Sequence, residues 1–133
     1  MNKIINPKSL VVPSGYSHGV ESSGGRTIYL AGQISMDRQG AVVHEGDIVK
    51  QFDQALNNLQ ETLRAGNAEM TDIVKLLIFV KDKRMYQKHL REIGAVYRSY
   101  FGKYFPSMSL VEVSSLFEDG ALIEIEGIAV VND

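Results

Sequence analysis

The sequence predicts an α+β protein in which one mixed β-sheet carries two helices packed on one of its faces. Two stretches place apolar residues at helical spacing, and several shorter stretches are rich in β-branched and aromatic residues. These stretches follow one another in the order β-β-α-β-α-β-β, with a turn before the first helix. That order favours a single mixed sheet with both helices on the same side.

The two helices are expected over residues 47–65 and 84–101. Asp47 is a candidate N-cap of the first helix, and Gly66 follows its last turn as a C-cap would. Gly102 stands at the end of the second helix. In the first helix the apolar residues fall at spacings of 4, 4, 3 and 4, which places them on one face: Ile48, Phe52, Leu56, Leu59 and Leu63. In the second helix the apolar stripe consists of Leu90, Ile93, Val96, Tyr97, Tyr100 and Phe101.

Four strands are clear from the sequence, and a fifth is weaker. The clear strands cover residues 26–31, 73–80, 109–113 and 122–131, the weaker one covers residues 17–22, and residues 37–40 read as a turn.

The last strand alternates between two faces, because successive side chains of a strand point in opposite directions. Glu124 and Glu126 share the face of Leu122, whereas Ile123, Ile125 and Ala129 share the other.

The strand over residues 73–80, IVKLLIFV, is apolar on both of its faces. Two helices can cover only one side of the sheet, and an uncovered apolar face usually finds a partner. We therefore expect the chain to associate with itself.

Composition narrows the function without assigning one. A length of 133 residues with 44% hydrophobic residues fits one domain spanning residues 1–133. A net charge of -2 gives no electrostatic reason to expect binding to nucleic acid or to anionic membranes. No cysteine is present, no apolar run approaches the ~20 residues that span a bilayer, and the N-terminus has no signal-peptide core. The cytoplasm is the resulting expectation.

Metal and cofactor sites have no support in the motifs. The three histidines are scattered without metal-ligand spacing, and no glycine-rich phosphate loop or nucleophile elbow is present. We expect neither a metal nor a cofactor.

Four stretches remain as candidates for chemistry: residues 15–20, 30–34, 105–109 and 122–129. Each also has a structural explanation, since an aromatic, a strand end, a proline and a solvated acidic face are all ordinary. Glu124 is the strongest candidate, because it lies inside the most apolar strand of the chain. If a neighbouring subunit covered its face, the carboxylate would be desolvated and suited to act as a general acid or base. Glu126 offers the same possibility, and the pattern does not choose between them.

In their order and spacing these stretches resemble the RidA/YjgF family, also known as endoribonuclease L-PSP. The resemblance runs almost from end to end. Its motifs are GYSHGV (15–20), IYLAGQI (28–34), the block over 46–82, YRSYF (97–101), FPSMSLVEV (105–113) and LIEIEGIAVV (122–131).

The resemblance implies a chorismate-mutase-like fold and a homotrimer, in which three sheets form a barrel-like core with a cleft at each subunit interface. Active members hydrolyse enamine or imine intermediates to keto acids and ammonia without a cofactor. An arginine holds the substrate carboxylate by a bidentate contact, and a glutamate on the last strand positions or activates water.

The family's site residues are only partly present in this chain. Tyr16, Gly32, Gln33 and Glu124 match substrate-binding and catalytic positions, whereas Ala31 replaces a serine. Three further positions depart from the pattern: Met108 stands at the arginine, Gly94 where many active members carry an asparagine, and Phe117 at a common proline.

Met108 is the most consequential departure, because methionine carries no charge and donates no hydrogen bond. Removing one partner of a buried arginine–carboxylate pair costs about 3–5 kcal/mol, roughly two to four decades in binding or rate. Neither Arg26 nor Arg98 lies in a matching motif, so no replacement is visible. We expect weak or absent activity on standard 2-imino acids and a ligand less anionic than an imino acid.

Three functions stay open at this point. The first is a divergent deaminase or hydrolase that uses Glu124 and water, and the second is a non-catalytic trimer that binds a small metabolite in its cleft. The third is the ribonuclease of the family's older label, which an acidic chain without a basic and aromatic stripe disfavours.

Overall fold

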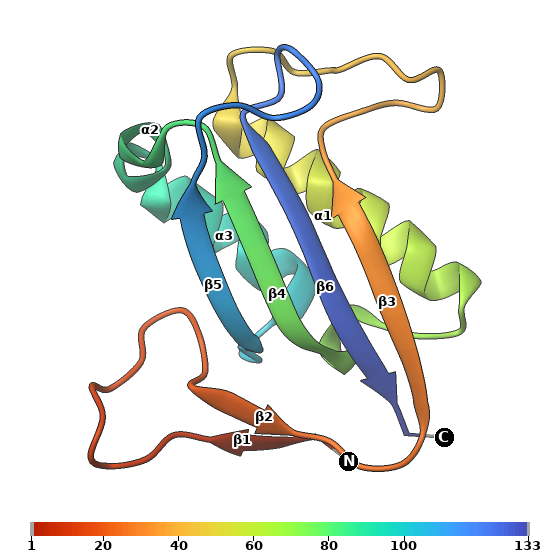
Figure 1. Cartoon of the computed structure of the whole chain (residues 1–133), viewed down its shortest axis with the longest axis vertical. Helices are drawn as coiled ribbons and strands as arrows, with labels where there is room; N and C mark the ends of the chain where they lie inside the picture. The colour runs from red at the N-terminus through yellow and green to blue at the C-terminus, as the bar shows by residue number, and fades with distance from the viewer. Residues whose placement is uncertain (1, 133) are drawn as a thin grey trace.

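The main sheet of the protein has four strands, and a computed structural model describes it within residues 2–132. The strands are ordered β3 (Arg26–Gln33), β6 (Ile123–Val131), β4 (Ile73–Val80) and β5 (Ser107–Glu112) across the sheet (Figure 1). β4 and β5 run parallel, whereas β6 is antiparallel to both of its neighbours. The predicted mixed sheet is therefore confirmed, with β3 and β5 at its two edges.

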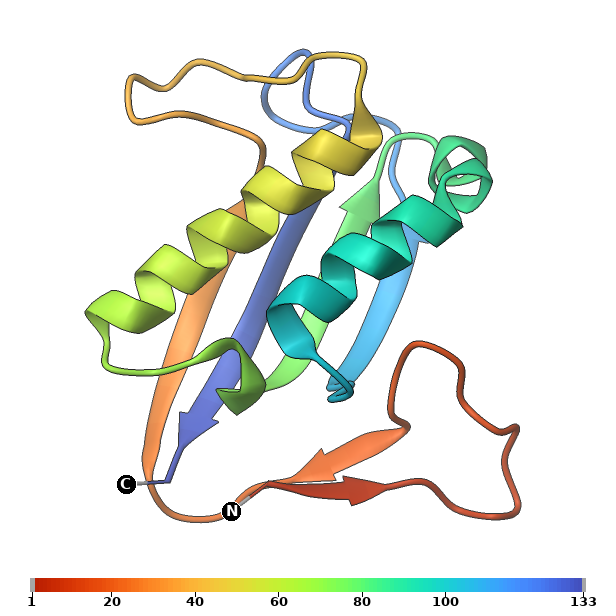
Figure 2. The ribbon, with the colours of Figure 1, turned by 180° about the vertical axis from the view of Figure 1, so that it is seen from behind.

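The helices cover one face of this sheet, as Figure 2 shows from behind. They are α1 (Ile48–Ala65), α2 (Lys83–Lys88) and α3 (Leu90–Phe101), and a short 3-10 helix, η1 (Met70–Asp72), precedes β4. Within the described range no helix is both long and apolar enough to cross a membrane.

The helix α1 follows its sequence pattern closely. Asp47 caps its start by accepting a hydrogen bond from the Lys50 backbone N–H at 3.0 Å, and Gly66 ends it. The five apolar residues that the spacing placed on one face are all buried in the core against the sheet.

The prediction of a single second helix was wrong. The chain leaves helical geometry at His89, where φ is -106° and ψ is 20°, so that α2 and α3 are separate helices. The ring Nδ1 of His89 lies 2.9 Å from the Met85 carbonyl oxygen, at the end of α2. The Met85 carbonyl also accepts from the His89 backbone N–H at 3.3 Å, so His89 closes the last turn of α2 with both its ring and its backbone.

The N-terminal hairpin also differs from expectation. The strand expected near residues 17–22 is β2 (Gly19–Glu21), and it pairs with β1 (Lys3–Ile5), which the sequence pattern did not predict. The two form a separate two-stranded sheet rather than part of the main one.

The far face of the main sheet has no cover within the described chain (Figure 1). On β6, Ile123, Ile125 and Ala129 are buried under the helices, whereas Glu124 and Glu126 lie half-buried on the far face, which confirms the predicted division. Apolar residues share the far face with the glutamates: Tyr29, Leu77, Phe79, Ile128 and Val130. Of these, Tyr29 is 77% exposed, which is unusual for a large aromatic residue in a sheet.

Candidate functional site

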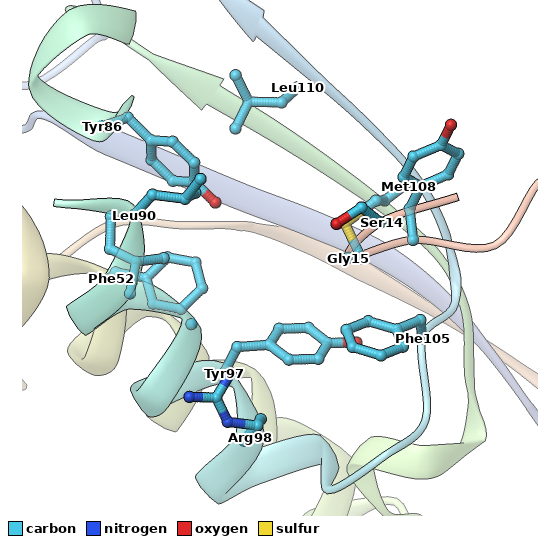
Figure 3. Close-up of a pocket in the computed structure, with 13 residues that line it drawn as sticks. Ser14, Gly15, Phe52, Tyr86, Leu90, Tyr97, Arg98, Phe105, Met108 and Leu110 are labelled. Carbon is cyan, nitrogen blue, oxygen red and sulfur yellow. The ribbon is translucent and has the colours of Figure 1, made fainter. Parts of the chain in front are cut away.

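A cavity of about 600 Å³ opens between α2, α3 and the edge strand β5 (Figure 3). Its other walls come from Phe52 of α1, Phe105 ahead of β5 and the loop Ser14–Tyr16. A volume of this size lies within the range of about 300–1,000 Å³ that is typical of small-molecule sites.

Met108 faces this cavity because of its register in the sheet. It pairs with Leu76 across the parallel β4–β5 ladder, and paired side chains point to the same face. Leu76 is buried under the helices, so Met108 lies on the helix-covered side of the sheet at its open edge.

Tyr16 reaches the same cavity because Ser17 anchors the preceding loop to the start of β5. The Ser17 backbone N–H donates to the Pro106 carbonyl at 3.0 Å, and its hydroxyl donates to the Phe105 carbonyl at 2.5 Å. His18 steadies the loop further, with its ring Nε2 2.7 Å from the Val11 carbonyl oxygen. The structure thus brings two of the predicted site residues, Tyr16 and Met108, to one pocket.

A stack of aromatic rings forms one wall. The ring of Tyr97 lies parallel to those of Phe101 and Phe105, with centroid distances of 4.4 Å and 5.1 Å. Its hydroxyl donates to the Tyr104 carbonyl at 2.7 Å. Burial raises the pKa of Tyr97 far above its usual value, so the hydroxyl keeps its proton and remains a donor at neutral pH.

Tyr86 lies on the opposite wall, edge-on to Phe52, with its ring directed toward the cavity (Figure 3). Burial raises the pKa of Tyr86 to about 12, so its hydroxyl is protonated at neutral pH. That hydroxyl has no hydrogen-bond partner among residues 2–132, which leaves it available to a ligand.

A second cluster of predicted residues lies elsewhere, on the far face of the sheet. A Cβ atom at Gly32 would stand 2.0 Å from Oε2 of Glu124, so the carboxylate rests directly on the glycine. The pairing of β3 and β6 shifts register between Leu30 and Gln33, next to this contact. Glu126 is paired with Leu77 further along β6 and away from this glycine. Glu124 is therefore the glutamate that belongs with the Gly32–Gln33 motif.

The side-chain amide of Gln51 joins the loop before α1 to the loop before β6. Its contact with Leu122 lies two residues before Glu124. Its side chain is fully buried, and its Nε2 donates to the carbonyls of His44 at 3.2 Å and Gly120 at 2.9 Å. Its Oε1 accepts from the Leu122 backbone N–H at 2.8 Å. Sequence patterns gave Gln51 no functional role. Its position beside Phe52 on α1 is compatible with the buried face of the helix, but the backbone groups that it bonds are not visible in the sequence.

The two clusters do not meet within one chain. Tyr16 and Met108 lie at the β5 edge on the helix side, whereas Gly32 and Glu124 lie toward the β3 edge on the far face. Figure 1 shows β5 and β3 at opposite sides of the sheet. Ala31 is exposed and Gln33 half-buried on β3, and Phe117 is 97% exposed in the loop before β6.

Arg98 is a cavity residue to which motif comparison gave no role, although it lies within the motif YRSYF (97–101). It lines the pocket together with Gly94, which stands one helical turn earlier on α3. One guanidinium nitrogen, Nη1, lies 3.3 Å from the position that a Cβ at Gly94 would take. The spacing of four residues between a glycine and an arginine on an amphipathic helix was the available sequence signal.

Metal ligands do not gather anywhere in the described part of the chain. Over residues 2–132 no group of three or more His, Cys, Asp or Glu side chains is placed to hold a metal ion.

Comparisons with known proteins agree on one family. A family model described as endoribonuclease L-PSP matches residues 7–131. A RutC family protein of Pyrococcus horikoshii is 35% identical over 130 residues, which cover 97% of this chain and 98% of that protein. The human 2-iminobutanoate/2-iminopropanoate deaminase is 32% identical over 105 residues, or 79% of this chain and 73% of the human protein. Among solved structures, YyfB of Yersinia pestis, a protein of unknown function of the conserved Rid protein family, superposes with a TM-score of 0.87 at 34% identity, covering 98% of both chains.

Proposed function

Because this chain belongs to the endoribonuclease L-PSP family, whose members also carry the names Rid and RutC, we propose that it is a divergent member with a small-molecule cleft between subunits. Within that cleft it hydrolyses an enamine- or imine-like metabolite with the help of Glu124. Family membership supports a deaminase-type or small-molecule-binding role in general terms, and the finer assignment rests on the geometry of the two clusters.

The observation that carries this proposal is the separation of the two clusters. One chain presents Tyr16 and Met108 at its β5 edge and Gly32 with Glu124 toward its β3 edge. A neighbouring copy that covered the apolar far face could place its Glu124 against the first copy's cavity. A cyclic trimer repeats such a head-to-tail contact three times and closes it. The uncovered apolar residues of the far face support this assembly.

The chemistry requires one carboxylate and one water molecule. Glu124 accepts a proton from water as the water oxygen bonds to the imine carbon, and it then returns a proton to the nitrogen. The product of this step is a tetrahedral carbinolamine. Glu124 then takes the proton of the new hydroxyl and passes it to the nitrogen as the carbon–nitrogen bond breaks, so that ammonia leaves and a carbonyl compound remains. No electron transfer takes place, so the reaction balances without a cofactor.

Met108 favours a second candidate, a trimer that binds a metabolite without turning it over. The side chain that replaces the motif arginine adds apolar surface to the cavity and cannot orient a substrate carboxylate. We accordingly propose that hydrolysis of 2-iminobutanoate or 2-iminopropanoate is weak or absent. A substrate with a different polar group, or a bound ligand that does not react, remains compatible with the cavity.

Ammonia release from a panel of imines and enamines, formed in place by an amino-acid deaminase, separates the two candidates. Glu124→Gln should abolish any turnover, whereas Glu126→Gln, on the same face of the same strand, should retain it. Sedimentation equilibrium should give a mass near three times 14.8 kDa. A monomer at micromolar concentration would contradict the shared cleft, and equal turnover by Glu124→Gln and wild type would contradict the assigned base.

Mixed trimers test the shared cleft directly. Glu124→Gln removes the carboxylate that one subunit would contribute, and Tyr16→Ala removes a cavity residue that its neighbour would contribute. A homotrimer of either variant should therefore be inactive. When equal amounts are co-expressed, about one quarter of the clefts should combine two intact halves and regain activity. Failure of the mixture to regain activity, with both variants folded and trimeric, would place the two halves in separate sites. If the protein proves to be a binder, ligand affinity replaces turnover in the same design.

A further inference from the structure

The cavity beside β5 has an unusual distribution of charge. Thirteen residues line it, and all of them belong to the described part of the chain. Arg98 is the only one among them that carries a formal charge at neutral pH, and no acidic side chain is present to neutralise it. The remaining lining is apolar or aromatic apart from a few hydroxyl groups. A cavity of this kind favours a ligand with one negative charge and an apolar body.

The guanidinium of Arg98 is available to such a ligand. Its side chain is exposed at the rim of the cavity, and within residues 2–132 it makes no hydrogen bond or ion pair. Arg26 provides a contrast, since its guanidinium donates to the carbonyls of Gly66 at 2.9 Å and Asn67 at 3.2 Å. Arg26 therefore joins β3 to the loop after α1, whereas the guanidinium N–H groups of Arg98 have no acceptor within residues 2–132.

Gly94 leaves the space in which Arg98 lies. Side chains of a helix lean toward its N-terminus, so Arg98 extends over the residue four positions earlier. Its Nη1 atom is 3.3 Å from where a Cβ of residue 94 would be, closer than an ordinary carbon–nitrogen contact. A Cβ at this position would require the guanidinium to move by a few tenths of an ångström, and a longer side chain would compete with it for the same space. The two departures from the family pattern at positions 94 and 108 therefore act together: one removes a cation from β5, and the other makes room for a cation on α3.

A second polar group faces the same space from α2. The Tyr86 hydroxyl has no partner within the described residues and retains its proton at neutral pH. Between Tyr86 and Arg98 the lining is apolar, with Leu90 and Ile93 on α3 and Met108 on β5. Flexible methionine and fixed aromatic rings are well suited to an aromatic or branched aliphatic group.

We propose that this cavity binds a small carboxylate with an aromatic or bulky apolar body, and that Arg98 anchors the carboxylate in place of the motif arginine lost at Met108. This inference rests on the small-molecule cleft proposed above and names the ligand class of that site. It also revises the expectation of a less anionic ligand, which followed from the absence of a cation at position 108 alone. The guanidinium at the rim binds the carboxylate by paired hydrogen bonds. The apolar body enters the cavity, and the Tyr86 hydroxyl donates to a polar atom within it.

Isothermal calorimetry with three probes tests the anchor. Phenylacetate and phenylacetamide have the same body and differ in charge, while 2-ketobutyrate has the charge and a small body. We expect wild type to bind phenylacetate more tightly than the other two by roughly tenfold or more, the scale of a charge-assisted hydrogen bond. Arg98→Gln should remove the preference for phenylacetate over phenylacetamide. Arg91→Gln is the matched control, since Arg91 is an exposed arginine of the same helix outside the cavity lining.

Two results would overturn the inference. One is equal affinity of wild type and Arg98→Gln for phenylacetate, and the other is no binding of any probe by folded wild type at millimolar concentration. Circular dichroism and sedimentation of each variant show that a loss of binding is not a loss of fold. The trimer mass, and the comparison of ammonia release between wild type and Glu124→Gln, are both measured on chains that keep Arg98. Failure of the anchor with those results intact therefore leaves the proposed function standing, whereas a monomer without turnover removes both.

Discussion

Replacing Gln51 with leucine should destabilise the protein more than any other polar-to-apolar change on α1. The Gln51 amide is completely buried and joins three backbone groups from two loops, at His44, Gly120 and Leu122. Leucine has similar size but satisfies none of them. His44 keeps another partner, since its carbonyl also accepts from the Asp47 backbone N–H at 3.1 Å. Two groups, the Leu122 N–H and the Gly120 carbonyl, are left without their bonds.

The expected loss follows from these two groups. A buried backbone group that loses its hydrogen bond costs about 1–3 kcal/mol, and the added apolar surface of leucine returns part of this. Gln51→Leu should therefore lower the free energy of unfolding by roughly 2–4 kcal/mol. Urea denaturation followed by circular dichroism measures the change, with both proteins at the same concentration because association adds to apparent stability.

Gln54→Leu is the matched control for this prediction. Gln54 lies on the same helix, and its Nε2 donates to the Asn58 side chain at 2.9 Å rather than to a buried loop. Its replacement should change stability by less than about 1 kcal/mol. If Gln51→Leu unfolds within about 0.5 kcal/mol of wild type, the loops do not depend on this amide, and the account of how β6 and Glu124 are positioned fails.

Four further predictions concern the two clusters. Gly32→Ala should fold, because only the flexible end of Glu124 must move. Displacing that carboxylate by about 1 Å or more should lower any turnover about a hundredfold. Unchanged turnover would show that the contact between Gly32 and Glu124 has no part in catalysis. Gly94→Ala should stabilise α3 by about 0.5–1 kcal/mol in thermal unfolding while weakening phenylacetate binding, because a methyl group crowds the guanidinium one turn later; tighter binding would argue against that crowding. Met108→Arg should improve binding of 2-ketobutyrate about tenfold or more by calorimetry, and equal binding by wild type would show that this position is not a lost anion site. Burial raises the pKa of Tyr86 from 10.0 to about 12, so the folded state holds the hydroxyl proton more tightly than the unfolded state does. The free energy of unfolding should therefore fall as the pH rises from 10 toward 12. Tyr86→Phe should reduce that fall in alkaline unfolding experiments.

The amino-acid sequence determined the elements whose evidence is local. The apolar stripe of α1, its Asp47 cap and the alternating faces of β6 depend on helix and strand geometry, which repeats over a few residues and can be read without knowledge of the fold. The strand pattern also indicated Glu124 as a candidate, whereas Tyr16, Gly32 and Met108 became candidates through the resemblance of short motifs to the family.

Tertiary structure decided everything that depends on residues distant in the chain. β1 forms because a partner strand fourteen or more residues later pairs with it. Arg98 became a cavity residue because β5 and the loop before β2 close the space in front of α3.

The division of the candidate site into two clusters was likewise invisible in the sequence. Motifs give the residues in order along the chain, but the order of strands across the sheet, β3-β6-β4-β5, decides which motifs become neighbours. Met108 and Glu124 belong to strands that β4 separates, and they point to opposite faces. Periodicity fixes the direction of a side chain relative to its own strand, whereas its neighbours are fixed by hydrogen bonding between strands, which no local pattern encodes.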